Sequence, residues 1–299
     1  MAALSPRSLA ALSTGTDPLG ALPEANMIRR AIPSSGETIP VVGLGTWQTF
    51  DVGEDTAQRA ALAAVLRSFV DLGGTVVDSS PMYGSSQVVM GDLAAETGLL
   101  DELWVATKVW IEGREAGIEQ MEETMAELRS PTIELMQVHN LVDVPVHLDT
   151  LQAWKAEGRI RYIGITTSSS RQYDRMEALL DDERLDFIQV NYSLAERESA
   201  QRVLPKAAER GVAVMVNRPF AGGALFRRLA SRPLPEWAGE IDASAWSQIF
   251  LKYILSHPAV TVAIPATSDP VHLRENMGGG VGRLPDEELR ERMEALLDG

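Results

Sequence analysis

The feature that most constrains this chain is a series of eight short apolar runs, rich in β-branched residues and separated by longer amphipathic segments. Uninterrupted apolar runs are typical of strands that are buried on both faces, as in a parallel sheet covered by helices. The intervening segments, such as 55–72 and 118–128, repeat apolar residues every three or four positions and therefore predict helices. The runs are residues 41–45, 75–78, 103–107, 135–139, 162–166, 187–191, 212–216 and 260–264. Eight strand–helix units that close on themselves predict an α/β fold, the (β/α)8 TIM barrel.

The N-terminal part of the chain differs from the repeating region. Residues 1–27 are rich in Ala, Leu, Ser, Pro and Gly without a helical or strand period, so we expect a flexible N-terminal extension. A Ser35-Gly36 turn signal between 30–32 and 38–39 predicts a short hairpin that closes the bottom of the barrel. Residues 28–299 are then expected to form one catalytic barrel domain.

Charge and composition restrict the partners of this chain. A net charge of -15 disfavours nucleic acid and anionic membranes, whose phosphates attract basic surfaces. With no cysteines, and four histidines without metal-ligand spacing, we expect no metal site. We expect a cytoplasmic protein; the Arg29-Arg30 pair leaves export by a twin-arginine route as an alternative, although no apolar core follows the pair. The oligomeric state is not legible from the sequence.

Four polar residues fall where barrel enzymes place their chemistry, at or after the carboxyl ends of strands. Asp78 and His139 end the second and fourth runs, Lys108 directly follows the third, and Tyr83 follows Asp78 in the next loop. Each residue alone has a structural interpretation: a helix cap, a solvated charge or a packing residue. Because a charge beside an apolar strand is costly unless it is paired, we expect Lys108 to pair with Asp78. The expected convergence of these four residues at one mouth of the barrel favours an active site.

The residue types suggest a proton-donating site that acts on a carbonyl group. Tyrosine has an ordinary pKa of about 10, and a lysine ammonium about 4 Å away would stabilise its phenolate and lower that pKa. His139 can donate a hydrogen bond to a carbonyl oxygen. A nicotinamide is the natural source of the hydride that such a carbonyl would need.

In these residues the chain resembles the aldo/keto reductase superfamily. The resemblance covers about residues 28–299, and five passages carry it: Gly43-Leu44-Gly45-Thr46-Trp47, residues 78–84, Thr107-Lys108-Val109, Gln137-Val138-His139-Asn140 and residues 264–276. It implies a barrel in which Tyr83 is the general acid, Asp78 and Lys108 tune it, and His139 orients the carbonyl. It also implies reduction of an aldehyde or ketone to an alcohol with NAD(P)H, bound without the G-x-G-x-x-G loop that this chain lacks.

The resemblance further implies a set of cofactor contacts. Gln189 matches a residue that binds the nicotinamide amide, whereas Arg218 has two interpretations, a phosphate ligand or a salt-bridged rim residue. Ala266 and His272 stand where many NADP-specific members have a Lys and an Arg, so NADP(H) is favoured through the family and NAD(H) remains open. The expected contacts are Thr46, Trp47, Thr166, Thr167, Gln189, Asn217, Arg218, Pro219, Thr267, Ser268, His272, Arg274, Glu275 and Asn276.

Aromatic residues after the strands predict an apolar substrate pocket for a small-molecule carbonyl compound. The expected pocket residues are Trp47, Phe50, Trp110, Asn140 and Trp237, the last in a long insert over 221–241. Aromatic residues at strand ends are equally often core caps, and the segment after His139 has an alternative interpretation as a helix-capping turn. The identity of the substrate is not legible from these residues.

Two other functions stay open. A nucleotide-binding regulatory subunit with little turnover would share the same fold and much of the same site. A hydrolytic or sugar-binding barrel would need two carboxylates roughly 5 to 9.5 Å apart at the mouth, and Asp78 is the one strong candidate. Reductase chemistry is therefore the favoured interpretation.

Overall fold

Eight parallel strands form one curled sheet in the computed structural model, which describes residues 27–298. The strands follow one another around the sheet in chain order. They are β3 (Leu44–Gly45), β4 (Val76–Asp78), β5 (Trp104–Val109), β6 (Ile133–Val138), β7 (Ile160–Thr166), β8 (Phe187–Asn191), β9 (Ala213–Asn217) and β10 (Val260–Ala263). Parallel bridges from Val42 to Ala263 and from Gly45 to Ala266 join the first strand to the last. The (β/α)8 barrel is therefore confirmed, whereas the expected extension over 1–27 lies, apart from Met27, outside the described residues.

Close backbone contacts join the first strand to β4 on one side and to β10 on the other, where the barrel closes at a seam between β3 and β10. A Cβ atom on Gly43 would lie 2.8 Å from the Val76 carbonyl oxygen, and one on Gly45 would lie 3.0 Å from the Ile264 carbonyl oxygen. Glycine therefore allows the first strand to approach both of its neighbours. The regular part of β3 is only two residues long, so this seam has fewer regular hydrogen bonds than the longer strand pairs.

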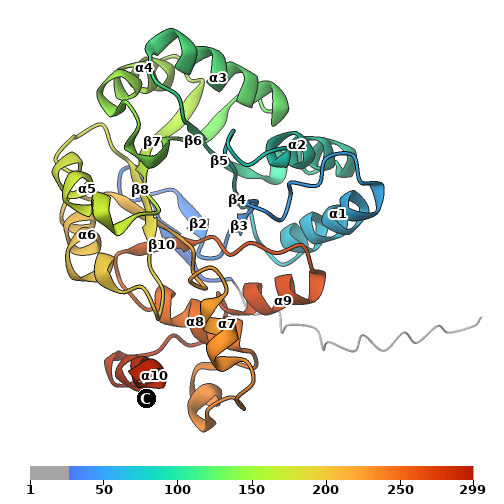
Figure 1. The fold of residues 1–299 in the computed structure, drawn as a ribbon, viewed down its shortest axis with the longest axis vertical. Coiled ribbons are helices and arrows are strands. Elements are labelled where there is room, and N and C mark those ends of the chain that lie inside the picture. Colours follow the sequence, from blue (N-terminus) through green and yellow to red (C-terminus); the bar gives the residue numbers. More distant parts are fainter. Residues whose placement is uncertain (1–26, 299) are drawn as a thin grey trace, which may run out of the picture.

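Helices surround the strands on the outside of the barrel (Figure 1). The predicted helix over 55–72 is α1, which begins after Asp55, whose carboxylate accepts the N–H groups of Ala57 and Gln58. The helices are α1 (Thr56–Asp71), α2 (Ser86–Thr97), α3 (Arg114–Glu127), α4 (Val144–Ala156), α5 (Tyr173–Leu179), α6 (Glu198–Glu209), α7 (Ala224–Leu229), α8 (Trp246–Leu255), α9 (Pro270–Gly278) and α10 (Glu287–Asp298). Short 3₁₀ turns cover Leu100–Glu102, His139–Leu141, Ser170–Gln172 and Glu236–Ile241. Within residues 27–298, no helix is both long and apolar enough to cross a bilayer.

The predicted N-terminal hairpin is present and lies at the bottom of the barrel. Strands β1 (Arg29–Ala31) and β2 (Thr38–Pro40) pair antiparallel, and Gly36 takes the left-handed backbone (φ 77°) that the turn requires. Ile32 and Ile39 pack with aromatic residues at or near the starts of β5, β7 and β8, namely Trp104, Tyr162 and Phe187. The hairpin thus closes the end of the barrel opposite to the strand carboxyl ends.

Inside the barrel, polarity changes along β5 and β8. On β5, Trp104 and Ala106 belong to the apolar interior cluster, and Lys108 follows them at the same two-residue spacing. On β8, Phe187 is apolar and Gln189 is polar in the same way. The interior is therefore apolar at the bottom and polar towards the carboxyl ends, where the functional residues gather.

Candidate active site

A buried ion pair forms the floor of the site. The Lys108 ammonium lies 2.8 Å from both carboxylate oxygens of Asp78 and donates to the Ser79 carbonyl at 2.7 Å. Neighbouring strands β4 and β5 bring the two charged residues together, and both are almost inaccessible to solvent. Burial lowers the pKa of Lys108, and the charge of Asp78 partly opposes that shift. The structure thus contains the pair that the sequence predicts.

Asp78 also binds two side-chain amides from across the barrel. The Nε2 group of Gln189 donates to the Asp78 carboxylate at 2.9 Å, and that of Gln137 lies 3.5 Å from the same oxygen. These contacts join β4 to β6 and β8 through the barrel interior. Four strands therefore fix the carboxylate that holds Lys108.

Tyr83 lies above this pair, in the turn that follows β4. Its backbone N–H donates to the Ser80 carbonyl at 3.0 Å, and its ring centroid lies 5.2 Å from the Lys108 ammonium. Burial, followed by the charge of Asp78, raises the pKa of the Tyr83 phenol above its ordinary value. The expectation of a lowered pKa is therefore wrong for this structure, because burial and the negative charge of Asp78 both disfavour the phenolate. Tyr83 remains protonated at neutral pH.

His139 directly follows β6 and faces Tyr83. The ring centroids are 6.0 Å apart with nearly perpendicular planes, and His139 Nδ1 lies 3.0 Å from the hydroxyl of Ser80. Burial, followed by the charge of Lys108, lowers the pKa of His139 to about 3. The imidazole is therefore neutral at physiological pH and can donate one hydrogen bond and accept another.

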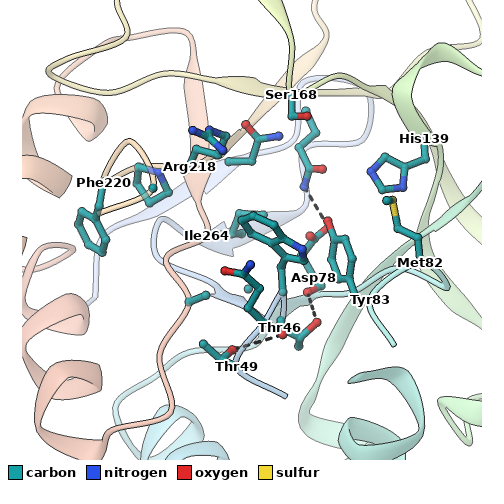
Figure 2. Close-up of a pocket in the computed structure, with 18 of the residues that line it drawn as sticks. Thr46, Thr49, Asp78, Met82, Tyr83, His139, Ser168, Arg218, Phe220 and Ile264 are labelled. Atoms are coloured by element: carbon teal, nitrogen blue, oxygen red, sulfur yellow. Dashed lines mark hydrogen bonds between the residues drawn. The ribbon is translucent and has the colours of Figure 1, made fainter. Parts of the chain in front are cut away.

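A cavity of about 350 Å³ opens above these residues. Figure 2 shows Met82, Tyr83 and His139 on one side of it, with Arg218 and Phe220 across from them. Its further lining residues include Trp47, Asn140, Ser168, Gln189 and Asn217. Three residues of this lining have positive φ angles although they are not glycines, Gln48 (63°), Asn140 (51°) and Arg218 (49°). Such backbone strain is most common at functional sites.

A second cavity, of about 610 Å³, adjoins the first, because Phe220 and Ala266 line both. One wall comes from the end of β10 and from α9, with Thr267, His272, Glu275 and Asn276. The other wall comes from the segment between β9 and α8, with Phe226, Arg232, Leu234, Ser244, Trp246 and Ser247. Together the cavities form an extended site that runs from the floor of the barrel mouth to α9.

Most of the expected cofactor contacts lie along these two cavities. Thr46, Trp47, Gln189, Asn217, Arg218 and Pro219 line the first, and Thr267, His272, Glu275 and Asn276 line the second. Thr166 and Thr167 are buried and line neither, because the Thr167 hydroxyl bonds to Gln172 and accepts the Ser169 N–H, and Ser168 reaches the first cavity instead. Ser268 and Arg274 also fall outside both linings.

Three of the five expected substrate-pocket residues lie outside the linings of both cavities. Phe50 is fully buried in the main apolar core, because the turn closed by its N–H bond to the Thr46 carbonyl folds it inward. Trp237 is only 8% exposed and belongs to the same core, so it forms no wall of either cavity. Trp110 is 41% exposed and lines neither cavity, although its ring lies 6.3 Å from that of His139.

Sequence reasoning missed several lining residues. Met82, Ser168 and Phe220 line the first cavity, and Arg232 and Trp246 line the second. Met82 lies within residues 78–84, one of the passages that carry the family resemblance, and its position beside Tyr83 is a signal for a place in the site. Nothing in the local sequence distinguishes Arg232 from the other arginines of the same insert.

Comparison with known proteins places the chain in one family. The family model described as "Aldo/keto reductase family" matches residues 41–297. Methylglyoxal reductase YeaE of Escherichia coli is 29% identical over 260 residues, which cover 84% of this chain and 89% of the relative.

Solved structures agree with this result. An aldo/keto reductase from Klebsiella pneumoniae, crystallised with NADP and acetate, is 28% identical with a TM-score of 0.76 over 87% of this chain and 92% of its own. A Klebsiella pneumoniae aldo-keto reductase in complex with NADPH is 26% identical with a TM-score of 0.76, over 90% of this chain and 95% of its own. On this evidence the chain belongs to the aldo/keto reductase family of oxidoreductases.

Proposed function

We propose that this protein reduces an aldehyde or ketone to an alcohol, with a hydride from NADPH and a proton from Tyr83. The observation that carries the proposal is the convergence of Asp78, Tyr83, Lys108 and His139 at the floor of one cavity. NADPH, when bound, supplies the hydride that reaches the carbonyl carbon. The residues of this chain position the carbonyl oxygen and protonate it.

The geometry suggests how the proton moves. A carbonyl oxygen between Tyr83 and His139 accepts a hydrogen bond from each, which favours the charge that the oxygen gains during reduction. The raised pKa of Tyr83 keeps the phenol protonated until the oxygen becomes strongly basic. Lys108 then stabilises the phenolate that remains, and Asp78 keeps Lys108 charged and in place.

The adjoining cavities suit an extended dinucleotide. The Asn217 Oδ1 atom and the Arg218 Nε atom are buried, and neither has a hydrogen-bond partner within the described part of the chain. Buried polar atoms of this kind are stabilised by a polar ligand. We assign the nicotinamide to the first cavity beside Gln189, and the adenosine to the second beside Glu275 and Asn276.

The preference for NADP(H) depends on a cation in the second cavity. Ala266 carries no charge, whereas Arg232 lines this cavity and can meet a 2′-phosphate as a bidentate donor. Tryptophan fluorescence titrations should show tighter binding of NADPH than of NADH by the wild-type protein. Arg232→Ala should weaken NADPH binding about tenfold or more and leave NADH binding unchanged.

Arg228→Ala is the matched control, because Arg228 bonds to the Leu297 carbonyl and does not line the cavity. Equal affinity of the wild-type protein for the two cofactors would contradict the NADP preference.

The mouth of the first cavity favours a substrate with an apolar substituent. Among the described residues, five large apolar side chains are exposed, and three of them lie at or beside this mouth: Trp47 and Met82 in its lining, and Trp110 beside His139. Each methylene that they bury contributes about 0.8 kcal/mol, so kcat/KM should rise about fourfold per carbon along a series of short alkanals. A flat series would favour a small dicarbonyl such as methylglyoxal, which the Escherichia coli relative reduces according to its name.

Tyr83→Phe tests the function itself. The variant should bind NADPH as the wild type does, and its turnover of a carbonyl panel should fall 10²- to 10⁴-fold, the contribution of general acid catalysis. Tyr162→Phe is the matched control, because Tyr162 lies at the bottom of the barrel. Unchanged turnover in Tyr83→Phe would contradict the role of Tyr83. Tight NADPH binding without wild-type turnover would favour the regulatory subunit instead.

A further inference from the structure

Ser80 connects two residues of the candidate active site. Its hydroxyl oxygen lies 3.0 Å from Nδ1 of His139, and its carbonyl accepts the Tyr83 N–H at 3.0 Å. Ser80 is fully buried and His139 is 6% exposed, so water does not compete freely for this hydrogen bond. The hydrogen bond between Ser80 and Nδ1 therefore determines whether the other ring nitrogen, Nε2, can donate or accept a hydrogen bond with a ligand.

The hydrogen-bond partners available to the Ser80 hydroxyl favour one of the two neutral tautomers of His139. If Nδ1 carried the proton and donated it to Ser80, the Ser80 hydroxyl proton would need a different acceptor. Within residues 27–298, the hydroxyl of Ser80 has no hydrogen-bond partner other than His139. A buried donor without an acceptor costs about 1–3 kcal/mol. Ser80 therefore donates to Nδ1, and the imidazole proton lies on Nε2.

We propose that Ser80 is a positioning residue that holds His139 as the Nε2–H tautomer, with this N–H available to the carbonyl oxygen of the substrate. The other tautomer would present the lone pair of Nε2 to a carbonyl oxygen, and the two acceptors would repel each other. His139 lines the cavity on the same side as Tyr83, which places its free nitrogen close to the proton donor (Figure 2). The role in reduction rests on the proposed function, but the tautomer itself does not.

Nuclear magnetic resonance of the ¹⁵N-labelled protein at neutral pH tests the tautomer without any turnover. His139 is one of four histidines, so the spectrum of a His139→Asn variant identifies its signals. We expect a protonated Nε2 and an unprotonated Nδ1 in the wild type, and a mixture of both tautomers in Ser80→Ala. A protonated Nδ1 in the wild type, or an unchanged tautomer in Ser80→Ala, would overturn the proposal.

Kinetics then test the consequence for the reaction. Ser80→Ala should lower kcat roughly tenfold, less than the 10²- to 10³-fold cost of deleting an oxyanion donor outright, with unchanged NADPH affinity. Ser80→Thr retains a hydroxyl and should recover turnover, provided that its urea unfolding curve shows that it folds. Ser199→Ala removes another buried hydroxyl, one that donates to the Asn191 carbonyl, and serves as the control.

Failure of the Ser80 proposal can be distinguished from failure of the proposed function. Wild-type kcat in Ser80→Ala would overturn the positioning role. If the wild-type protein reduces no carbonyl compound, the proposed function fails, and the resonance experiment still decides whether Ser80 sets the tautomer.

Discussion

The two ends of the barrel are built from the same strands and differ in what they place inside. At the bottom, Trp104 and Phe187 pack with the hairpin residues Ile32 and Ile39 in an apolar cluster. At the mouth, the interior holds Lys108, four residues after Trp104 on β5, and Gln189, two residues after Phe187 on β8. Apolar burial is favourable without any partner, whereas each buried polar group needs a specific one. The barrel thus gains stability at its bottom and keeps costly polar chemistry at its mouth.

The hairpin adds polar contacts only at the rim of the bottom. The Tyr162 hydroxyl donates to Glu37 at 2.5 Å, and Arg161 pairs with the same carboxylate. Arg30 donates to backbone carbonyls near the start of β10, among them that of His257. Arg161 and Glu37 keep access to solvent, so their ion pair contributes little compared with the apolar cluster.

The largest expected effect comes from removing the charge at the mouth. Lys108→Met should abolish measurable turnover and lower the free energy of unfolding by about 3–5 kcal/mol, because Asp78 is left buried without its partner. Urea unfolding and kcat measure the two effects. Adding Asp78→Asn should restore much of the stability and none of the turnover. Lys206→Met, which removes a more exposed ion pair with Asp181, should have little effect on either.

A substitution at the bottom should show the opposite pattern. Ile39→Ala should lower the free energy of unfolding by about 2–5 kcal/mol, since it leaves a cavity under the barrel. Its kcat should match that of the wild type at temperatures where the variant is folded. Ile39→Val is the graded control and should cost about 0.5–1.5 kcal/mol. A loss of kcat in folded Ile39→Ala would show that the two ends are coupled.

The third effect depends on pH. Because the pKa of His139 falls from its ordinary 6.5 to about 3 on folding, the unfolded chain binds more protons between these values. Stability should therefore be lost as the pH falls below about 6.5, by up to about 1.4 kcal/mol per unit from this group. Urea unfolding at pH 4 to 7 should show a shallower acid limb for His139→Asn. Parallel curves would show that His139 is not held neutral.

Much of the fold was predictable because the barrel repeats one pattern. Continuous apolar runs predict strands that are buried on both faces, and the amphipathic segments between them predict the covering helices. The same pattern brings Asp78, Lys108 and His139 to one mouth, because each lies at or directly after the end of a run. The pairing of Lys108 with Asp78 followed from the cost of an unpaired buried charge.

The remaining features depend on side-chain direction in loops, which no period specifies. Phe50 and Trp237 are aromatic residues in loops, and sequence alone does not show whether such residues turn inward or towards a cavity. Ser168 replaces Thr167 in the first cavity because hydrogen bonds turn the Thr167 side chain away. The raised pKa of Tyr83 reflects the degree of burial, which is set by the whole tertiary structure.

A nucleotide bound in the first cavity would also stabilise the seam between β3 and β10. Gly45 on one side of the seam and Ile264 and Ala266 on the other all line the first cavity. A nucleotide bound there would contact both sides at once, so part of its binding free energy would oppose local opening of the ring. The amide protons of Gly43 and Gly45, which bond to the Ala263 and Pro265 carbonyls across the seam, should then exchange with solvent more slowly when cofactor is bound.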